Sequence, residues 1–342
     1  MAHEFKEILE TLSEGVDLSS GQAEFALNQI VEGRASSEEA AAFLFGMRSK
    51  GETVEELTSF VRVMRDASVS VDVDTESAVD LCGTGGDRSG TFNISTAAMF
   101  VVAGAGIPVL KHGNRSVSSL CGSADVLETL GAVATLDKAG VERVYEQTGM
   151  AFMFAPNFHP AMRFIMPARR ALKIRTFFNI LGPLLNPADV KRQVVGAYNR
   201  ETASLMIRIL GNLQTEKAFT LSARDGLDEL STTSPTDVFE LTQSENGDTF
   251  LFEPESLGFS LVDMAELRGG DAARNADIIR SVLDGHSTPA QREIVHLNAA
   301  FGIHASGMTS TLAEASALAG ESIGSGSGRK KLNDFVKATQ EA

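Results

Sequence analysis

The stretch AVDLCGTGGDRSGTFNIST, residues 78–96, indicates the class of fold. Its first four residues predict a short strand, which ends in glycines. Hydroxyl and amide side chains follow, and a helix is predicted over residues 95–105. A strand, a glycine-rich turn and a helix in this order are typical of an α/β domain with a largely parallel sheet.

The same alternation recurs further along the chain. A strand is predicted at 107–110, followed by KHGNR at 111–115 and by a helix at 123–130. A strand, a helix and a strand then follow at 193–197, 201–213 and 217–221. Ligands of such sheets bind beyond the carboxyl ends of the strands, so both glycine-bearing motifs are predicted to lie at a binding site.

The regions on either side of this alternation show other patterns of predicted secondary structure. Residues 4 to about 70 predict a helical bundle, with helix start signals such as the capping box of Thr53 and Glu56. Residues 222–270 are rich in turns and predict strands with loops. Four more helices are predicted at 275–283, 291–301, 312–319 and 333–340, with a Gly/Ser-rich turn inside 320–331.

Composition limits the classes of protein that remain. The 342 residues suggest one large domain or two unequal ones, and the net charge of −15 disfavours nucleic acid as a partner. Cys82 and Cys121 lack the spacing of a zinc site or a disulfide framework, which fits a reducing compartment. The first residues lack the apolar core of a signal peptide, and no apolar run suits a membrane span. We therefore expect a cytoplasmic protein without a membrane partner.

The glycine tract GTGGD, residues 83–87, can bring backbone amides close to an anion. It is neither a P-loop nor a dinucleotide fingerprint, and alone it fits a plain turn as well as an anion loop. Asn93, Ser95 and Thr96 are expected to cap the helix that begins near Ala97. The same groups could also bind phosphate or a metal ion.

The second motif, KHGNRSVSS at residues 111–119, is the densest site for a polyanion in this acidic chain. After an apolar strand it combines a histidine, a glycine and three serines with two side chains that are positively charged at neutral pH, Lys111 and Arg115. Ser123 is expected to start the next helix, with Asp125 and Glu128 supporting its first turns. Glu128 is expected to be structural.

Two further motifs carry possible ligands. FAPNFHPAMR at 154–163, followed by Arg169 and Arg170, suits a flat aromatic acid, although at most one of the adjacent arginines can face such a site. DGLDE at 225–229 places carboxylates on a turn. It suits either a solvated acidic turn or a Mg²⁺ site that the ion shares with phosphates.

GTGGD with TFNIST, KHGNR with SS, GSADVLE, FAPNFHPAMR, RTFFNILGPLLNP and DGLDEL occur in this order and resemble the anthranilate phosphoribosyltransferases of tryptophan biosynthesis. The resemblance begins in EEAAAFLFGMRSKGET, residues 38–53, and extends to the C-terminal helix. It implies transfer of the 5-phosphoribosyl group of phosphoribosyl pyrophosphate (PRPP) to the amine of anthranilate. It also implies a homodimer.

The resemblance further implies an α/β fold of the nucleoside phosphorylase/phosphoribosyltransferase class II type. A small N-terminal helical domain, residues 1–73, would be joined in space by a helical segment near 163–188. A large α/β domain with a mostly parallel sheet, residues 74–342, would bind PRPP and Mg²⁺. The active site would lie at the hinge between the two domains.

Site residues follow by motif. The residues implied to bind PRPP are Gly83, Gly86, Asp87, Thr91, Asn93, Ile94, Ser95, Thr96, Lys111, His112, Gly113, Asn114, Arg115, Ser118, Ser119 and Ser123. Those implied for anthranilate are Gly83, Asn114 and Arg169, with His112 and Pro183 nearby. Two Mg²⁺ ions would be held by Ser95, Asp228 and Glu229.

The chemistry needs no indispensable general base, because the aromatic amine of anthranilate is already a neutral nucleophile that mainly requires positioning. His112 is a weak candidate for that role and is expected to serve in packing. The chain departs from the family pattern at Lys173, where a glycine is expected. The nearest alternative is a pyrimidine nucleoside phosphorylase, in which a KxSGR-type motif would replace KHGNR. A nucleic-acid-binding relative of the same fold is disfavoured by the net charge.

Overall fold

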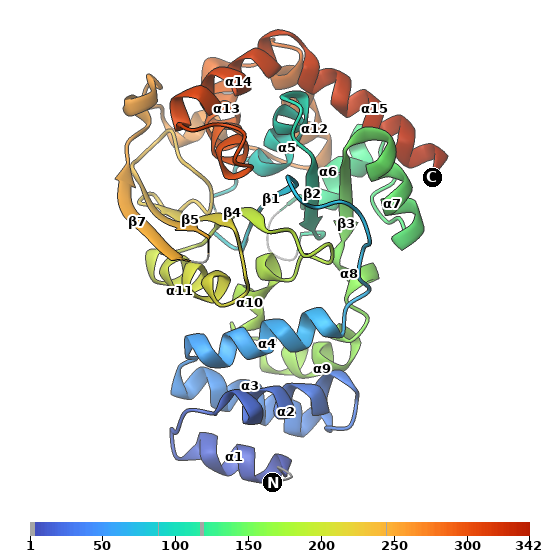
Figure 1. The fold of residues 1–342 in the computed structure, drawn as a ribbon, viewed down its shortest axis with the longest axis vertical. Coiled ribbons are helices and arrows are strands. Elements are labelled where there is room, and N and C mark those ends of the chain that lie inside the picture. The colour runs from blue at the N-terminus through green and yellow to red at the C-terminus, as the bar shows by residue number, and fades with distance from the viewer. Residues whose placement is uncertain (1–3, 88, 117–119, 244) are drawn as a thin grey trace.

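The structure is a computed structural model that describes the whole chain except residues 1–3, 88, 117–119 and 244. A helical part lies at one end of the long axis, and an α/β part with one sheet occupies the rest (Figure 1). This is the architecture that the alternation of elements predicted. Within the described residues, no helix is both long and apolar enough to cross a membrane.

The N-terminal bundle contains α1 (Phe5–Ser13), α2 (Ser20–Val31), α3 (Ser37–Lys50) and α4 (Val54–Asp66). Ser19, Ser36 and Thr53 cap the last three of these helices by accepting from the N3 backbone amide. The capping box predicted for Thr53 and Glu56 is confirmed. Cap chemistry in the sequence therefore located the start of α4.

A later segment of the chain packs onto this bundle. Helix α9 (Met162–Leu172) lies against α2 and α3, below the sheet in Figure 1. The ring of Phe177, which follows α9, stacks on Phe60 of α4 at a centroid distance of 4.5 Å. One apolar cluster continues from the bundle through these residues to the β4 side of the sheet. The helical part is therefore anchored on the α/β part by buried side chains.

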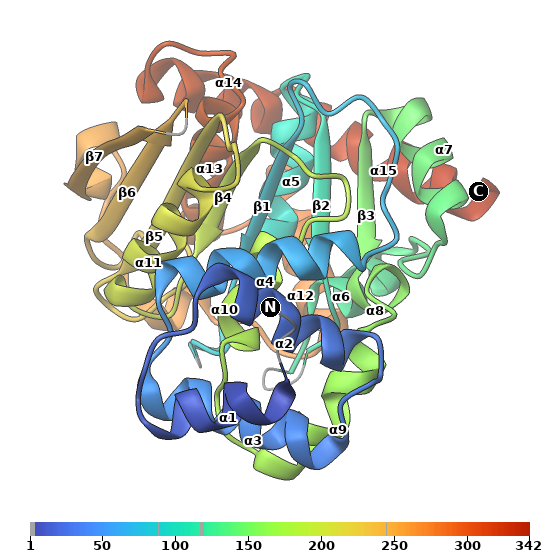
Figure 2. The ribbon, with the colours of Figure 1, turned by 60° about the horizontal axis from the view of Figure 1, so that its bottom comes forward.

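The sheet has the strand order β3-β2-β1-β4-β5-β6-β7. The first five strands in this order are parallel and β6 and β7 are antiparallel additions. Their bounds are β1 (Val79–Gly83), β2 (Val109–Gly113), β3 (Met150–Phe154), β4 (Arg192–Gly196), β5 (Lys217–Ala223), β6 (Thr236–Thr242) and β7 (Glu245–Phe252). Figure 2 shows the strands side by side, with β7 at one edge and β3 at the other.

Strand β2 corrects one prediction. It was expected at 107–110 with KHGNR after it, but Lys111 and His112 lie inside the strand, paired with Phe152 and Met153 of β3. Pairing with β3 extends the strand, because the backbone groups of a central strand must be hydrogen-bonded whatever side chains they carry. Consecutive strand residues face opposite sides, so Lys111 and His112 point to different faces of the sheet.

Helices cover the sheet on both faces. The larger apolar cluster lies between the sheet and α5 (Ile94–Gly104), α6 (Ser123–Leu130), α12 (Ala272–Leu283), α13 (Pro289–Ala305), α14 (Leu312–Gly324) and α15 (Ser327–Glu341). The remaining helices are α7 (Lys138–Thr148), α8 (Ala155–Phe158), α10 (Phe178–Leu181) and α11 (Arg200–Gly211), with 3₁₀ turns at Gly182–Leu184, Pro254–Leu257 and Met264–Leu267. The Gly/Ser-rich turn expected within 320–331 is short, because α14 continues to Gly324 and α15 begins at Ser327.

Candidate active site

The loop after β1 is shaped by glycine. Gly85, Gly86 and Gly90 have φ values of 66°, 76° and 71°, a left-handed backbone that side chains disfavour. Gly83 pairs with Gly196 across β1 and β4, and both approach Asp228. A Cβ on Gly196 would lie only 1.6 Å from the carbonyl oxygen of Asp228. The two facing glycines therefore leave the space into which the acidic loop fits.

Asp228 joins that acidic loop to the glycine loop. Its Oδ2 accepts a hydrogen bond of 2.6 Å from the backbone amide of Gly85. Burial, together with the nearby charge of Asp87, raises the pKa of Asp228 above its ordinary value. Asp225 instead stabilises its own loop by accepting from the amide of Leu227 and the hydroxyl of Ser231. Only part of the acidic motif therefore faces the glycine loop.

Glu229 occupies the start of α5. Its Oε1 accepts from the backbone amide of Ser95 at 3.1 Å. The prediction that Asn93, Ser95 and Thr96 cap this helix is wrong. Asn93 is at the N-cap position but its side chain makes no capping bond, and Ser95 and Thr96 lie inside the first turn. A carboxylate distant in sequence satisfies the free amide instead, since a helix N-terminus favours negative charge.

The side chain of Asn93 is used elsewhere. Its Nδ2 donates to the carbonyl oxygen of Cys121 at 3.2 Å, and its Oδ1 accepts from Nδ2 of Asn275 at 3.0 Å. These bonds tie the start of α5 to the loop before α6 and to α12. Asn93 therefore positions the loops on either side of it.

Lys111 supplies the buried positive charge of this region. Its side chain is almost fully buried, and Nζ donates to the carbonyl oxygen of Leu81 and, at 3.2 Å, to Oγ of Ser95. Burial and the charge of Asp228 raise the pKa of Glu229, while Lys111 lowers it in part. Lys111 therefore offsets part of the negative charge of Glu229, and it reaches the start of α5 through its hydrogen bond to Ser95.

Ser95, Asp228 and Glu229 fit a magnesium ion by the chemistry of their atoms. They offer a hydroxyl and two carboxylates, the hard oxygen ligands that Mg²⁺ prefers alongside substrate phosphates and water. A divalent cation would favour the ionised form of carboxylates whose pKa burial has raised. In the part of the chain that the structure describes, no three His, Cys, Asp or Glu side chains gather as a metal group.

Five other residues implied for PRPP lie along the same edge. Asp87 accepts from the amide and hydroxyl of Ser89, and Thr91 forms an isolated bridge with Arg268. Ile94 and Thr96 are buried in the first turn of α5. Gly113 ends β2, where a Cβ would lie 2.7 Å from the ring of Phe152. The fold thus brings the two glycine-bearing motifs together, as their positions after strands predicted.

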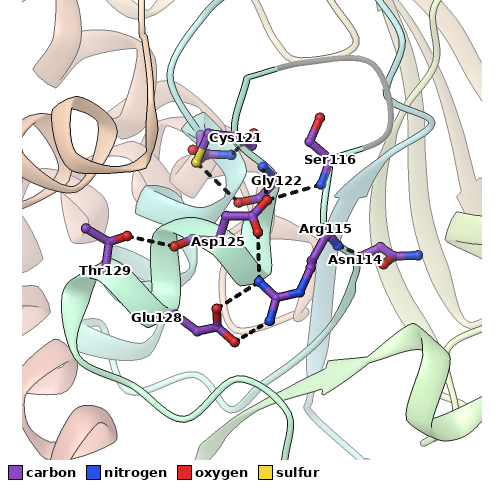
Figure 3. A network of polar contacts seen from close by, with 9 residues as sticks. Asn114, Arg115, Ser116, Cys121, Gly122, Asp125, Glu128 and Thr129 are labelled. Atoms are coloured by element: carbon purple, nitrogen blue, oxygen red, sulfur yellow. Dashed lines mark hydrogen bonds and ion pairs between the residues drawn. The ribbon is translucent and has the colours of Figure 1, made fainter.

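The motif after β2 leads into α6, which begins at Ser123 as predicted. Asn114 and Arg115 directly follow β2. Figure 3 shows the guanidinium of Arg115 bound to Asp125 and Glu128 of α6. Ser118 and Ser119, also predicted to bind PRPP, lie outside the described residues.

His112 faces the opposite side of β2 and meets His159, with ring centroids 5.1 Å apart. Burial and the neighbouring His159 lower the pKa of His112 to about 3, and burial lowers that of His159 to about 4. Nε2 of His112 is buried and has no hydrogen-bond partner among the described residues. At neutral pH both rings are therefore neutral and weakly basic, which disfavours His112 as a general base.

Of the two adjacent arginines, Arg169 is half-buried and Arg170 is exposed. The guanidinium carbon of Arg169 lies 5.6 Å from the ring centre of Phe178. Among residues with described positions, Arg169 has no carboxylate within ion-pair distance. Pro183 lies on the sheet side, where its carbonyl oxygen accepts from Nε2 of Gln193 at 3.2 Å.

Sequence reasoning missed Arg175 and Asn186. Nη2 of Arg175 donates to the carbonyl oxygen of Gly86 at 3.1 Å, and its guanidinium lies 4.4 Å from the ring centre of Tyr198. Nδ2 of Asn186 donates to Asp80 and to the carbonyl oxygen of Leu110, both at 2.8 Å. Both residues lie in the RTFFNILGPLLNP motif, for which the sequence predicted no polar contacts.

Two family models match the chain. Residues 75–329 match the glycosyl transferase family, a/b domain, and residues 6–68 match the glycosyl transferase family, helical bundle domain. The anthranilate phosphoribosyltransferase of Salinibacter ruber (strain DSM 13855 / M31) is 47% identical, and the match covers 98% of each chain.

Solved structures agree with these matches. The crystal structure of anthranilate phosphoribosyltransferase from Thermus thermophilus superposes with a TM-score of 0.91 at 34% identity, covering 97% of this chain and 99% of that one. The anthranilate phosphoribosyltransferase of Saccharomyces cerevisiae in complex with PRPP and Mg gives a TM-score of 0.90 at 26% identity, covering 99% and 98%. The same yeast protein in complex with 4-fluoroanthranilate gives 0.89 at 25% identity, again covering 99% and 98%.

Proposed function

The chain belongs to the anthranilate phosphoribosyltransferases, within the glycosyl transferase family, and from this membership we propose how its own residues serve the reaction. The enzyme transfers the 5-phosphoribosyl group of PRPP to the amine of anthranilate. The products are N-(5-phosphoribosyl)anthranilate and pyrophosphate, and the step belongs to tryptophan biosynthesis.

One observation carries the assignment of the PRPP site. Asp228 and Glu229 follow β5, yet they hydrogen-bond to Gly85 after β1 and to Ser95 at the start of α5. The anion loop and the acidic turn, each ambiguous alone, thus share one edge of the sheet. Because the two loops are hydrogen-bonded to each other, we favour a site for magnesium and pyrophosphate at DGLDE over a solvated turn.

We propose that Ser95, Asp228 and Glu229 hold two Mg²⁺ ions with PRPP. When bound, Mg²⁺ neutralises the pyrophosphate and stabilises the negative charge that grows on it as its bond to ribose C1′ breaks. Backbone amides of the glycine loop and the first turn of α5, other than those of Gly85 and Ser95 that bind the two carboxylates, would add fixed donors to the same anion. Lys111 acts indirectly, because its Nζ already bonds to Leu81 and Ser95.

We propose that anthranilate binds on the side of the site that faces the helical bundle. Arg169 would pair with its carboxylate, and Asn114 would contact the ring substituents between the two substrates. His112 and Pro183 would form the neutral wall. Because the amine is neutral at pH 7, the residues here need to orient it toward C1′ and to exclude water, without taking a proton first.

We also propose the larger organisation. Residues 1–73 with the segment near 163–188 form the small domain, and the rest of residues 74–342 form the large one. The packing of α9 on α3 supports this division. We further propose a cytoplasmic homodimer that makes no use of nucleic acid, and light scattering after size-exclusion chromatography tests the dimer.

The direct test follows the fluorescence of anthranilate in the presence of PRPP and Mg²⁺. We expect the signal to fall with time and the fall to stop when EDTA is added. A parallel reaction with thymidine and inorganic phosphate should yield no thymine. Stable anthranilate fluorescence across a full magnesium titration would refute the proposed function.

A further inference from the structure

Arg115, the last residue of KHGNR, is bound by two carboxylates of α6. Its Nη1 donates to Oδ1 of Asp125 and to Oε2 of Glu128, each at 2.8 Å. Its Nη2 donates to Oε1 of Glu128 at 2.6 Å, so the pairing with Glu128 is bidentate (Figure 3). In this arrangement the positive charge of Arg115 is already neutralised by the protein.

Asp125 has a second set of partners. Its Oδ2 accepts from the backbone amide of Ser116 at 3.2 Å and from that of Gly122 at 2.9 Å. These two amides lie at opposite ends of the loop between β2 and α6. One carboxylate therefore joins both ends of this loop and also binds Arg115.

The backbone of Gly122 lies so close to that of Arg115 and Ser116 that no larger residue fits at this position. A Cβ on Gly122 would lie 2.3 Å from the nitrogen of Ser116. Arg115 also reaches the end of β3, since its guanidinium carbon is 5.5 Å from the ring centre of Phe154. The contacts of Arg115 thus connect the ends of β2 and β3 to the first turns of α6.

The residues on either side of these contacts belong to the proposed PRPP site. Oδ1 of Asn114 accepts from the amide of Arg115 at 2.7 Å, and its carbonyl oxygen accepts from the amide of Ala124 at 3.3 Å. Ser123 directly follows Gly122. Any shift of Arg115 against α6 would therefore move both Asn114 and Ser123.

We propose that Arg115, Asp125 and Glu128 form a clasp that positions Asn114 and Ser123 for PRPP, with Arg115 acting through the two carboxylates rather than by touching the substrate. This inference rests on the proposed function. It assigns Asp125 and Glu128 as positioning residues and changes the expected role of Arg115 from a phosphate ligand to the centre of the clasp.

Whether PRPP binds more tightly or more weakly after the carboxylates are removed distinguishes the clasp from direct binding of PRPP by Arg115. If Arg115 bound PRPP directly, removing its carboxylate partners would free its charge and tighten PRPP binding. If the clasp positions the loop, Glu128→Gln and Asp125→Asn should both raise the Kd for PRPP, by about tenfold for the loss of charge-assisted hydrogen bonds. Calorimetry with PRPP and Mg²⁺, without anthranilate, measures this.

A double-mutant cycle gives a second readout. In the clasp, Arg115→Ala already removes the interaction that Glu128→Ala removes, so the double variant should bind PRPP about as weakly as Arg115→Ala alone. Additive losses, or tighter binding by Glu128→Ala, would overturn the clasp. Asp334→Asn is the matched control, because it removes a carboxylate from an exposed ion pair with Lys330 on α15. Its Kd should equal that of the wild type.

Two further measurements keep the outcomes distinct. Amide hydrogen exchange at Ser116 and Gly122 should be faster in Asp125→Asn, whereas unchanged exchange there would contradict the clasp. Thermal unfolding should show that each variant is folded at the assay temperature. If the wild type itself does not bind PRPP, the proposed function fails; if it binds and both carboxylate variants bind equally well, only the clasp fails.

Discussion

A Cβ atom added to Gly83 would lie 2.5 Å from Oδ2 of Asp228, which is the carboxylate oxygen that accepts the amide of Gly85. The end of β1 is therefore in van der Waals contact with a proposed metal ligand from a loop far along the chain. Room for this carboxylate, more than backbone freedom, explains glycine at this position.

Gly83→Ala should displace the Asp228 carboxylate. We expect kcat/KM to fall by roughly 10- to 100-fold, since overpacking a tight contact costs about 1–3 kcal/mol. Steady-state kinetics at saturating magnesium measures the loss. Gly21→Ala is the matched control, because a Cβ at Gly21 meets nothing within 4 Å. Equal kinetics for Gly83→Ala and the wild type would contradict the contact.

Removing charge from Asp228 and Glu229 should change the magnesium requirement. For the double variant Asp228→Asn with Glu229→Gln, we expect the magnesium concentration at half-maximal rate to rise by about tenfold or more. Asp225→Asn is the control within the same loop, because Asp225 bonds to Leu227 and Ser231. It should lower the Tm and leave the magnesium titration unchanged. An unaltered titration in the double variant would remove Asp228 and Glu229 from the proposed magnesium site.

Arg169→Ala should change the KM values of the two substrates to different extents. Losing a charged partner costs about 1.5–3 kcal/mol, so the KM for anthranilate should rise by roughly 10- to 100-fold while that for PRPP changes little. Initial rates with each substrate varied in turn measure both constants. Arg170→Ala, on the exposed side of the same helix, should change neither. Similar increases in both constants for Arg169→Ala would remove Arg169 from the carboxylate site.

The buried histidines should make stability depend on pH. Burial depresses the pKa of His159 to about 4, below the unfolded value, so its contribution is complete above the unfolded pKa and is lost as the pH falls toward 4. His159→Phe removes this penalty. Between pH 7 and pH 5 its free energy of unfolding should gain about 2 kcal/mol relative to the wild type.

Urea unfolding of the wild type and of His159→Phe at both pH values provides the measurement. The comparison cancels the contributions of the buried carboxylates, which change stability in the opposite direction as the pH falls. A difference between the two proteins that stays constant from pH 7 to pH 5 would show that His159 titrates normally.

Lys173 ends α9 with a φ of 52°, in the left-handed region where glycine is favoured. The expectation of glycine at this position thus has a physical reason. Lys173→Gly should raise the free energy of unfolding by about 0.5–1 kcal/mol. Lys337→Gly, within the exposed face of α15, should lower it by about 1 kcal/mol. A loss of stability in Lys173→Gly would count against strain at this turn.

Interactions between residues close together in the sequence determine many of the helix starts and turns of this fold. Thr53 and Glu56 marked the start of α4, because capping depends on residues within one turn. The glycine loop after β1 follows from the positive φ values that Gly85, Gly86 and Gly90 adopt. The start of α6 at Ser123 follows from Asp125, which accepts from the amide of Gly122. Local signals failed where pairing between strands decided the outcome, as for Lys111 and His112 inside β2.

The site divides in the same way. The sequence by itself determined which residue types were present and, through ordered motifs, the family to which they belong. Only the tertiary structure decided that Glu229 accepts from Ser95, that the buried Lys111 also donates to Ser95, and that Asp125 holds Arg115. The reason is physical: a buried amide, cation or carboxylate must find a partner, and that partner is chosen by packing across the fold rather than by distance along the chain.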